Sequence, residues 1–108
     1  MSIETTSWFN KQLKQLAKKY RSIPEDYANL LHSLVENPLQ GTPIRRGAFK
    51  IRMPIASKNS GKSGGSRVIT YYRDEKDTLY LLDIYDKSER GNISPQDLDY
   101  FIDEINKI

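Results

Sequence analysis

The apolar residues of this 108-residue chain change their spacing near residue 47, and this change constrains the fold more than any other feature. Before it, apolar side chains recur every three or four residues, as on one face of a helix. After it, Phe49, Ile51 and Met53 alternate with Lys50 and Arg52. A strand at this place would bury the first three side chains and project both cations from the opposite face. The sequence therefore predicts a fold that combines helices with a sheet.

Three helices are predicted in addition to the sheet. Residues 7–21 place apolar side chains on one face and three lysines on another, which is typical of a basic amphipathic helix. A second helix begins near Ser22, whose spacing to Glu25 fits a capping box, and it ends at Asn37. The first two helices are therefore expected to form a helical hairpin. A short helix with Ser94 as its N-cap closes the chain.

Two further strands are predicted from β-branched and aromatic composition, at residues 67–73 and 79–85, with residues 74–77 as a hairpin connection. Strands joined in this way pair antiparallel. The predicted fold class is α+β, in which the helical hairpin and the short C-terminal helix pack on one side of a mainly antiparallel sheet.

Length and composition limit what such a chain does. One core is expected at this size, so we predict a single domain over residues 1–108. The chain has no cysteine and a single histidine, His32, which argues against disulfides, thiolate chemistry and a Cys-based or His-based metal site. We expect no metal and no other cofactor. No signal-peptide pattern or membrane-length apolar run is present, so a soluble, cytoplasmic protein is expected.

The charges of this chain are segregated along the sequence. No Asp or Glu occurs between Asn37 and Arg73, and eight cations lie there: Arg45, Arg46, Lys50, Arg52, Lys58, Lys62, Arg67 and Arg73. The other residues hold all 14 acids and the remaining 9 of the 17 Lys and Arg, so a segment of +8 is flanked by residues that sum to −5. A local positive potential of this kind attracts a polyanion such as nucleic acid. The alternative is a solvated basic face without a function.

Residues 57–67, SKNSGKSGGSR, form a loop rich in glycine and serine between two predicted strands. The loop is not a nucleotide-binding P-loop, because Ala56 stands where the first glycine is needed and a strand rather than a helix follows. Small residues still let backbone N–H groups approach a phosphate, with Lys58 and Lys62 beside them. The alternative is a mobile hairpin loop that its lysines keep soluble.

An antiparallel sheet would bring several of these cations together. Lys50 and Arg52 share one face of a strand, Arg67 begins the next strand, and Lys87 follows the third. Cations that converge without a carboxylate repel one another, a cost more typical of functional sites than of scaffolding. No Asp/Glu pair or suitable histidine supplies an acid and a base. Phosphoryl transfer here would depend on electrostatic stabilisation, with Lys, Arg or Tyr as proton carriers.

Four segments carry a resemblance to a known family: FKIR at residues 49–52, GKSGGSR at residues 61–67, VITYY at residues 68–72 and LLDIYDKSE at residues 81–89. Together they resemble the RelE/HigB branch of the RelE/ParE superfamily of bacterial toxins. The family's order of helical hairpin, sheet and final helix is similar, and its short N-terminal strand would fall at residues 2–5, which gives a sheet of three to four strands.

The resemblance implies a type II toxin that a cognate antitoxin protein neutralises and that cleaves messenger RNA on the translating ribosome. The ribose 2′-OH attacks the adjacent phosphate without a metal in that mechanism. By position, Lys50 and Arg52 match paired basic residues at the scissile region, one of which acts as base. Arg67 matches an arginine that stabilises the phosphate. Lys87 lies where the best-known members have an arginine beside the leaving group, and it lacks that side chain's planar fork.

One position departs from the family. A late tyrosine of some members falls close to Ile93, which transfers no proton, so Tyr85, Tyr71 or Tyr72 is a candidate substitute. The residues predicted to contact RNA outside the catalytic set are Lys58, Lys62, Arg45, Arg46, Arg73 and Tyr85. Each has a structural alternative; Arg67, for example, would pair with Asp103 or Glu104.

Three functions are compatible with the sequence. The first is the ribosome-dependent endoribonuclease, which would contact mRNA and ribosomal RNA and would require the four catalytic cations to cluster. The second is a ParE-like inhibitor of DNA gyrase, which has no such requirement. The third is a catalytically inactive RNA- or ribosome-binding module.

Overall fold

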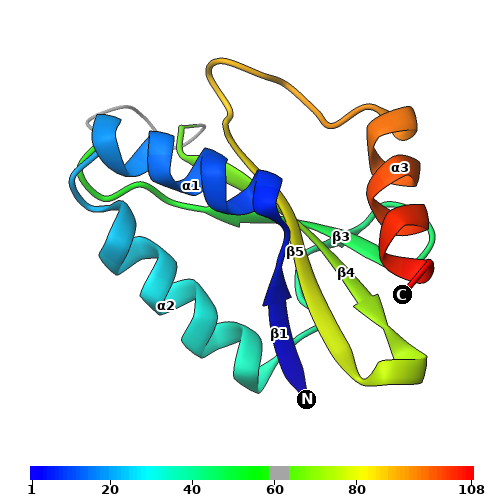
Figure 1. Cartoon of the computed structure of the whole chain (residues 1–108). Helices are drawn as coiled ribbons and strands as arrows, with labels where there is room; N and C mark the ends of the chain where they lie inside the picture. Colours follow the sequence, from blue (N-terminus) through cyan, green and yellow to red (C-terminus); the bar gives the residue numbers. More distant parts are fainter. Residues whose placement is uncertain (59–63) are drawn as a thin grey trace.

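The computed structural model describes residues 1–58 and 64–108, and Figure 1 shows their arrangement. The elements are β1 (Ser2–Thr5), α1 (Ser7–Lys19), α2 (Ile23–Glu36), β2 (Thr42–Pro43), β3 (Ala48–Met53), β4 (Ser66–Arg73), the 3-10 turn η1 (Asp74–Lys76), β5 (Thr78–Asp86) and α3 (Pro95–Asn106). The predicted helices and strands are all present, and their bounds differ from the predicted ones by a few residues. The α+β fold class is confirmed.

The sheet has five strands in the order β1-β5-β4-β3-β2. The pairs β5–β4, β4–β3 and β3–β2 are antiparallel, and β1 runs parallel to β5. The sheet is larger than the predicted three to four strands. The N-terminal strand implied by the family resemblance is present, and the two-residue β2 forms the other edge, where proline and short length limited any sequence signal.

The helices cover both faces of the sheet, so the prediction of helices on one side was wrong. In Figure 1, α1 and α2 lie on one side of the sheet and α3 lies on the other. One core cluster joins Phe9, Leu16 and Leu34 to β3, β4 and β5, and a second joins α3 to Ile69 and Leu82. Strands β4 and β5 are buried on both faces along most of their length. Such near-continuous apolar strands require cover on each side.

One predicted helix start follows its sequence signal and one does not. Ser94 caps α3 as predicted, and its side chain accepts a hydrogen bond from the Asp97 backbone N–H. The capping box at the start of α2 was wrong, because Ser22 makes no side-chain cap. Its hydroxyl instead donates to Asp26 at 2.7 Å and lies 2.9 Å from the Ser57 hydroxyl. Ser22 therefore holds the segment after β3 against α2.

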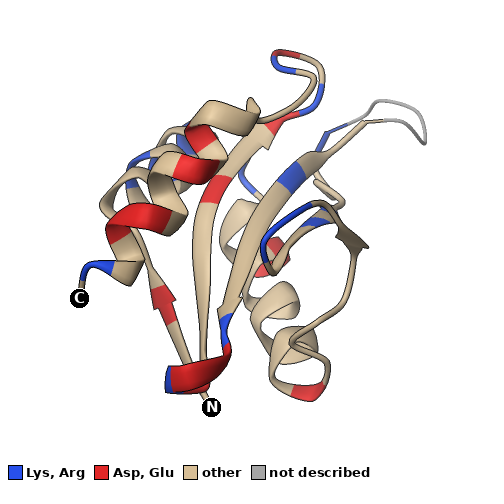
Figure 2. Ribbon diagram, turned by 90° about the vertical axis from the view of Figure 1, so that its right-hand side faces the viewer, with Lys and Arg blue, Asp and Glu red and all other residues tan. Residues whose placement is uncertain are grey.

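Charge is distributed unevenly over these elements. Figure 2 shows acidic positions concentrated along the C-terminal helix α3 and basic positions on strands of the sheet. None of the helices in the described residues has the length and apolar character of a membrane span.

Position 41 requires glycine for two reasons, the left-handed backbone conformation and the lack of space for a side chain. Its φ is +100°, and a Cβ atom added there would lie 2.6 Å from the Lys50 carbonyl oxygen. We expect Gly41→Ala to lower the free energy of unfolding by at least about 2 kcal/mol, because it combines backbone strain with a backbone clash. Gly91→Ala is the matched control, since a Cβ there meets no atom within 4 Å. Urea unfolding of both variants measures the difference, and an equal effect at the two sites would contradict the prediction.

Candidate functional site

Three predicted cations lie on one face of the sheet, the face that α3 partly covers. Lys50 and Arg52 alternate with buried Ile51 on β3, and Arg52 is the direct cross-strand partner of Arg67 on β4. Lys50 and Arg52 share a face of β3 with Ala48, and Arg67 shares a face of β4 with Ile69. Both Ala48 and Ile69 pack under α3. Like charges directly opposite each other destabilise a sheet. The arrangement therefore concentrates positive charge that an anion could relieve.

No carboxylate neutralises these cations. In residues 1–58 and 64–108, none of the ion pairs involves Lys50, Arg52, Arg67 or Lys87, and residues 59–63 contain no acid. Nζ of Lys50 donates to Oδ1 of Asn92 at 3.1 Å, a neutral acceptor. An Arg67 guanidinium nitrogen donates to the Ser66 carbonyl at 3.2 Å. The positive charge at this end of the sheet is available to a ligand.

Tyr85 lies beside Arg67 as its partner across β4 and β5. Its hydroxyl is buried and has no hydrogen-bond partner in the described residues. Burial raises the pKa of Tyr85, and the nearby charge of Arg90 opposes this effect. The hydroxyl therefore stays protonated at neutral pH but is a weaker acid than an ordinary tyrosine, so its candidacy depends on its position beside Arg67.

The other two tyrosines proposed as substitutes lie elsewhere. The Tyr71 hydroxyl donates to Asn106 near the end of α3, and the Tyr72 hydroxyl donates to Asp77 at the far end of the β4–β5 hairpin. Tyr85 is therefore the tyrosine among the three that the fold brings to the cationic face.

Lys87 directly follows β5, and its backbone N–H donates to the Gly65 carbonyl at 3.0 Å. This bond places Lys87 next to the start of β4, where Arg67 lies. Its side chain is half-buried.

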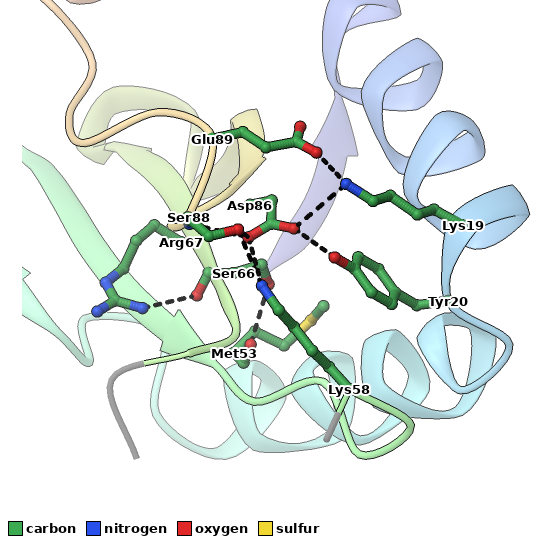
Figure 3. Close-up of polar contacts among 9 residues, drawn as sticks. All are labelled: Lys19, Tyr20, Met53, Lys58, Ser66, Arg67, Asp86, Ser88 and Glu89. Atoms are coloured by element: carbon green, nitrogen blue, oxygen red, sulfur yellow. Dashed lines mark hydrogen bonds and ion pairs between the residues drawn. The ribbon is translucent and has the colours of Figure 1, made fainter. Parts of the chain in front are cut away.

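Lys58 lies on the opposite face of the sheet from Arg67, in a network around Asp86 (Figure 3). The Asp86 side chain is fully buried and accepts hydrogen bonds from Lys58 at 2.8 Å and from the Tyr20 hydroxyl at 2.7 Å. Burial works to raise the pKa of Asp86, but the hydrogen bonds from Lys58, Tyr20 and Ser88 outweigh it and hold the pKa well below its usual range. With 13% of its side chain exposed, Lys58 has a structural partner that the sequence analysis did not identify.

The remaining cations predicted to contact RNA either have partners within the protein or lie outside the described residues. Arg45 and Arg46 form ion pairs with acids of α3, and Arg46 rather than Arg67 takes Asp103, at 2.7 Å. Arg73 is 8% exposed and donates to the carbonyls of Ile105 and Ile108, so it anchors the C-terminus and has little surface to offer RNA. Lys62 lies outside the described residues.

Sequence reasoning missed two residues of the segment after β5. Arg90 pairs with Asp83 at 2.6 Å, and its guanidinium lies 4.3 Å from the centre of the Tyr85 ring. Asn92 accepts the bond from Lys50. Neither residue belongs to a periodic pattern, and the one available signal was that Arg90 is a cation close in sequence to Tyr85.

The topology is that of a small α+β domain, with helices on both faces of a mixed sheet and a cationic patch at one end. Its fold is similar to that of an E. coli RelE toxin mutant in the free state, with a TM-score of 0.62, 15% identity and 96% coverage of each chain. It is also similar to RelBE2 of Mycobacterium tuberculosis, a toxin-antitoxin complex, with a TM-score of 0.57, 22% identity and coverage of 79% of this chain and 95% of that one. The E. coli RelBE toxin-antitoxin complex matches with a TM-score of 0.53, 19% identity and coverage of 77% and 92%.

The sequence itself matches a family described as the RelE toxin of the RelE/RelB toxin-antitoxin system, over residues 1–107. The chain belongs to the RelE toxin family.

Proposed function

We propose that this chain is a ribosome-dependent endoribonuclease that cleaves messenger RNA. The observation that carries the proposal is the pairing of Arg52 with Arg67 next to Lys50 on one sheet face, where no ion pair of the described residues involves these three cations. Family membership supports it. A ParE-like gyrase inhibitor does not require cations to converge on a phosphate, so this geometry favours the nuclease.

The proposed reaction uses groups of the protein alone. The RNA 2′-oxygen forms a bond to the adjacent phosphorus while the bond from phosphorus to the 5′-oxygen breaks, which leaves a 2′,3′-cyclic phosphate and a 5′-OH. Lys50, in its neutral amine form, accepts the proton of the 2′-OH and becomes an ammonium, while Arg52 stays charged and donates to the phosphate. Arg67 donates to the phosphate oxygens, whose negative charge grows in the transition state.

The leaving 5′-oxygen requires a proton and charge stabilisation. Tyr85 replaces the late tyrosine that Ile93 cannot supply, because it neighbours Arg67 and its hydroxyl can donate a proton. Lys87 contributes positive charge from the end of β5. The Tyr85 hydroxyl is buried, so it must become exposed to reach the RNA.

A cognate antitoxin is the second proposed partner. The likeness to solved toxin-antitoxin complexes supports such a partner. An acidic or helical antitoxin segment would neutralise the toxin by covering Lys50, Arg52 and Arg67, or by displacing α3 from the same sheet face.

The test is cleavage of a defined mRNA on programmed ribosomes by the purified chain. We expect a cut within the translated part of the mRNA, a product with a 2′,3′-cyclic phosphate and no cut in the same mRNA without ribosomes. The cyclic end is detected because it blocks ligation until a phosphatase that opens it is added. If the chain binds ribosomes without cutting, it is an inactive binding module. If it inhibits DNA supercoiling by gyrase instead, the nuclease proposal fails.

A further inference from the structure

Arg90 is held in a fixed orientation beside Tyr85. Its Nη2 donates to Oδ2 of Asp83 at 2.6 Å, and its guanidinium stacks over the Tyr85 ring at 4.3 Å. The side chain is still 34% exposed. A guanidinium carries five N–H donors, so one bond to Asp83 leaves donors for a second anion.

Asp83 is itself fixed within β5. Its side chain is 1% exposed, and Oδ1 accepts a hydrogen bond from the indole N–H of Trp8 at 2.9 Å. Burial raises the pKa of Asp83, while the charge of Arg90 and the bond from Trp8 oppose that effect. Asp83 is the buried member of the pair and Arg90 the partly exposed one, so the buried carboxylate anchors a guanidinium that solvent still reaches.

The segment after Arg90 is also tied to the site. Asn92 accepts a hydrogen bond from Lys50, and Ile93 packs into the core cluster that contains Tyr85. Arg67 lies across the strands from Tyr85, and Arg90 covers the ring of the same tyrosine. Two guanidinium groups thus flank one hydroxyl-bearing side chain at the cationic end of the sheet.

We propose that Arg90 is a further phosphate-binding residue and that Asp83, held by Trp8, is the positioning residue that fixes it. This inference rests on the proposed ribonuclease function. Arg90 would donate to the phosphate from the Tyr85 side of the site while Arg67 donates from the strand side. Asp83 never touches the RNA and acts only through Arg90.

A double-mutant cycle on programmed ribosomes tests this assignment. The rate constant of single-turnover mRNA cleavage is measured at saturating toxin for the wild type, Arg90→Ala, Asp83→Asn and the double variant. We expect Arg90→Ala to lower the rate constant about 100-fold and Asp83→Asn to lower it about 10-fold. In the Arg90→Ala background, Asp83→Asn should have no further effect, because residues that act as a unit are not additive.

Two additional variants separate positioning from folding. Asp83→Asn keeps the shape of the side chain and an acceptor for Trp8, and unfolding temperatures establish that each variant is folded. Arg90→Lys changes a partly exposed side chain and keeps its charge, so it folds even if Asp83→Asn does not. It should restore part of the rate lost in Arg90→Ala but not all of it, because lysine lacks the planar fork.

The outcomes are distinguishable. Absence of cleavage by the wild type overturns both the proposed function and this inference. Cleavage by the wild type with an unchanged rate in Arg90→Ala overturns the inference alone. A further loss from Asp83→Asn in the Arg90→Ala background overturns the positioning role, because Asp83 would then act independently of Arg90.

Discussion

Bacteria that stop growing when the wild-type chain is induced will continue to grow when the induced chain carries Lys50→Ala and Arg67→Ala together. The double variant removes the proposed base and the arginine that stabilises the phosphate. Loss of one preorganised donor typically costs a factor of about 100 to 1,000 in rate, and we expect a combined loss of at least about 1,000-fold. Mapping of mRNA 5′ ends after induction measures it, and new ends within translated regions should appear only with the wild type.

The control variant is Lys18→Ala together with Lys76→Ala. It removes the same charge from two exposed positions, on α1 and on η1, and neither side chain forms an ion pair in the described residues. We expect this control to arrest growth and to produce the same mRNA ends as the wild type. If Lys50→Ala/Arg67→Ala is equally toxic, the cationic face is not catalytic. Growth arrest without mRNA cuts would instead direct attention to gyrase or another protein target.

Asp86→Ala will destabilise the protein by about 3–5 kcal/mol at neutral pH, the effect typical of breaking a buried ion pair. The Asp86 carboxylate is fully buried and joins Lys58, Tyr20 and Ser88, which come from three separate parts of the chain. Its removal leaves each of these donors without its acceptor. Urea unfolding at pH 7 measures the loss. Glu89→Gln is the matched control, because Glu89 binds Lys19 of the same network but is 58% exposed, and we expect it to change stability little.

The contribution of Asp86 to stability should depend on pH in one direction. The folded state lowers the pKa of Asp86, and the unfolded chain has the ordinary value of about 4. A lowered pKa stabilises the folded state above that ordinary value, and the stabilisation is lost as pH falls toward the folded pKa. The difference in unfolding free energy between the wild type and Asp86→Asn should therefore shrink from pH 7 to pH 3. A difference that stays constant or widens would show that Asp86 does not act through its charge.

Local sequence patterns were sufficient for the three helices and for β3, β4 and β5, whereas β1 was implied only by the family resemblance and β2 was not predicted. Period-two alternation predicted that Lys50 and Arg52 share one face of β3, because successive side chains of a strand point to opposite faces. Ser94 and Pro95 predicted the start of α3, since a cap acts within one helical turn. These signals depend on neighbours in the sequence, which is why they could be recognised without the structure.

Pairings between distant residues could not be predicted in the same way. Lys58 and Arg46 carry the same charge as Lys50, yet the fold brings Asp86 to the first and Asp103 to the second. The residues next to a cation in the sequence do not show whether it will contact RNA or pair with an acid of the protein. Whether a cation is neutralised depends on what the chain brings beside it.

By itself the sequence determined the three helices, the three central strands, their order and the concentration of positive charge, because each depends on residues that lie near one another along the chain. Only the tertiary structure decided which charges remain available. Strand register places Arg52 opposite Arg67 and Tyr85 beside Arg67, while the packing of α1 brings Trp8 to Asp83 and thereby fixes Arg90. Register and packing depend on contacts between residues far apart in sequence, and the geometry of the site follows from those contacts.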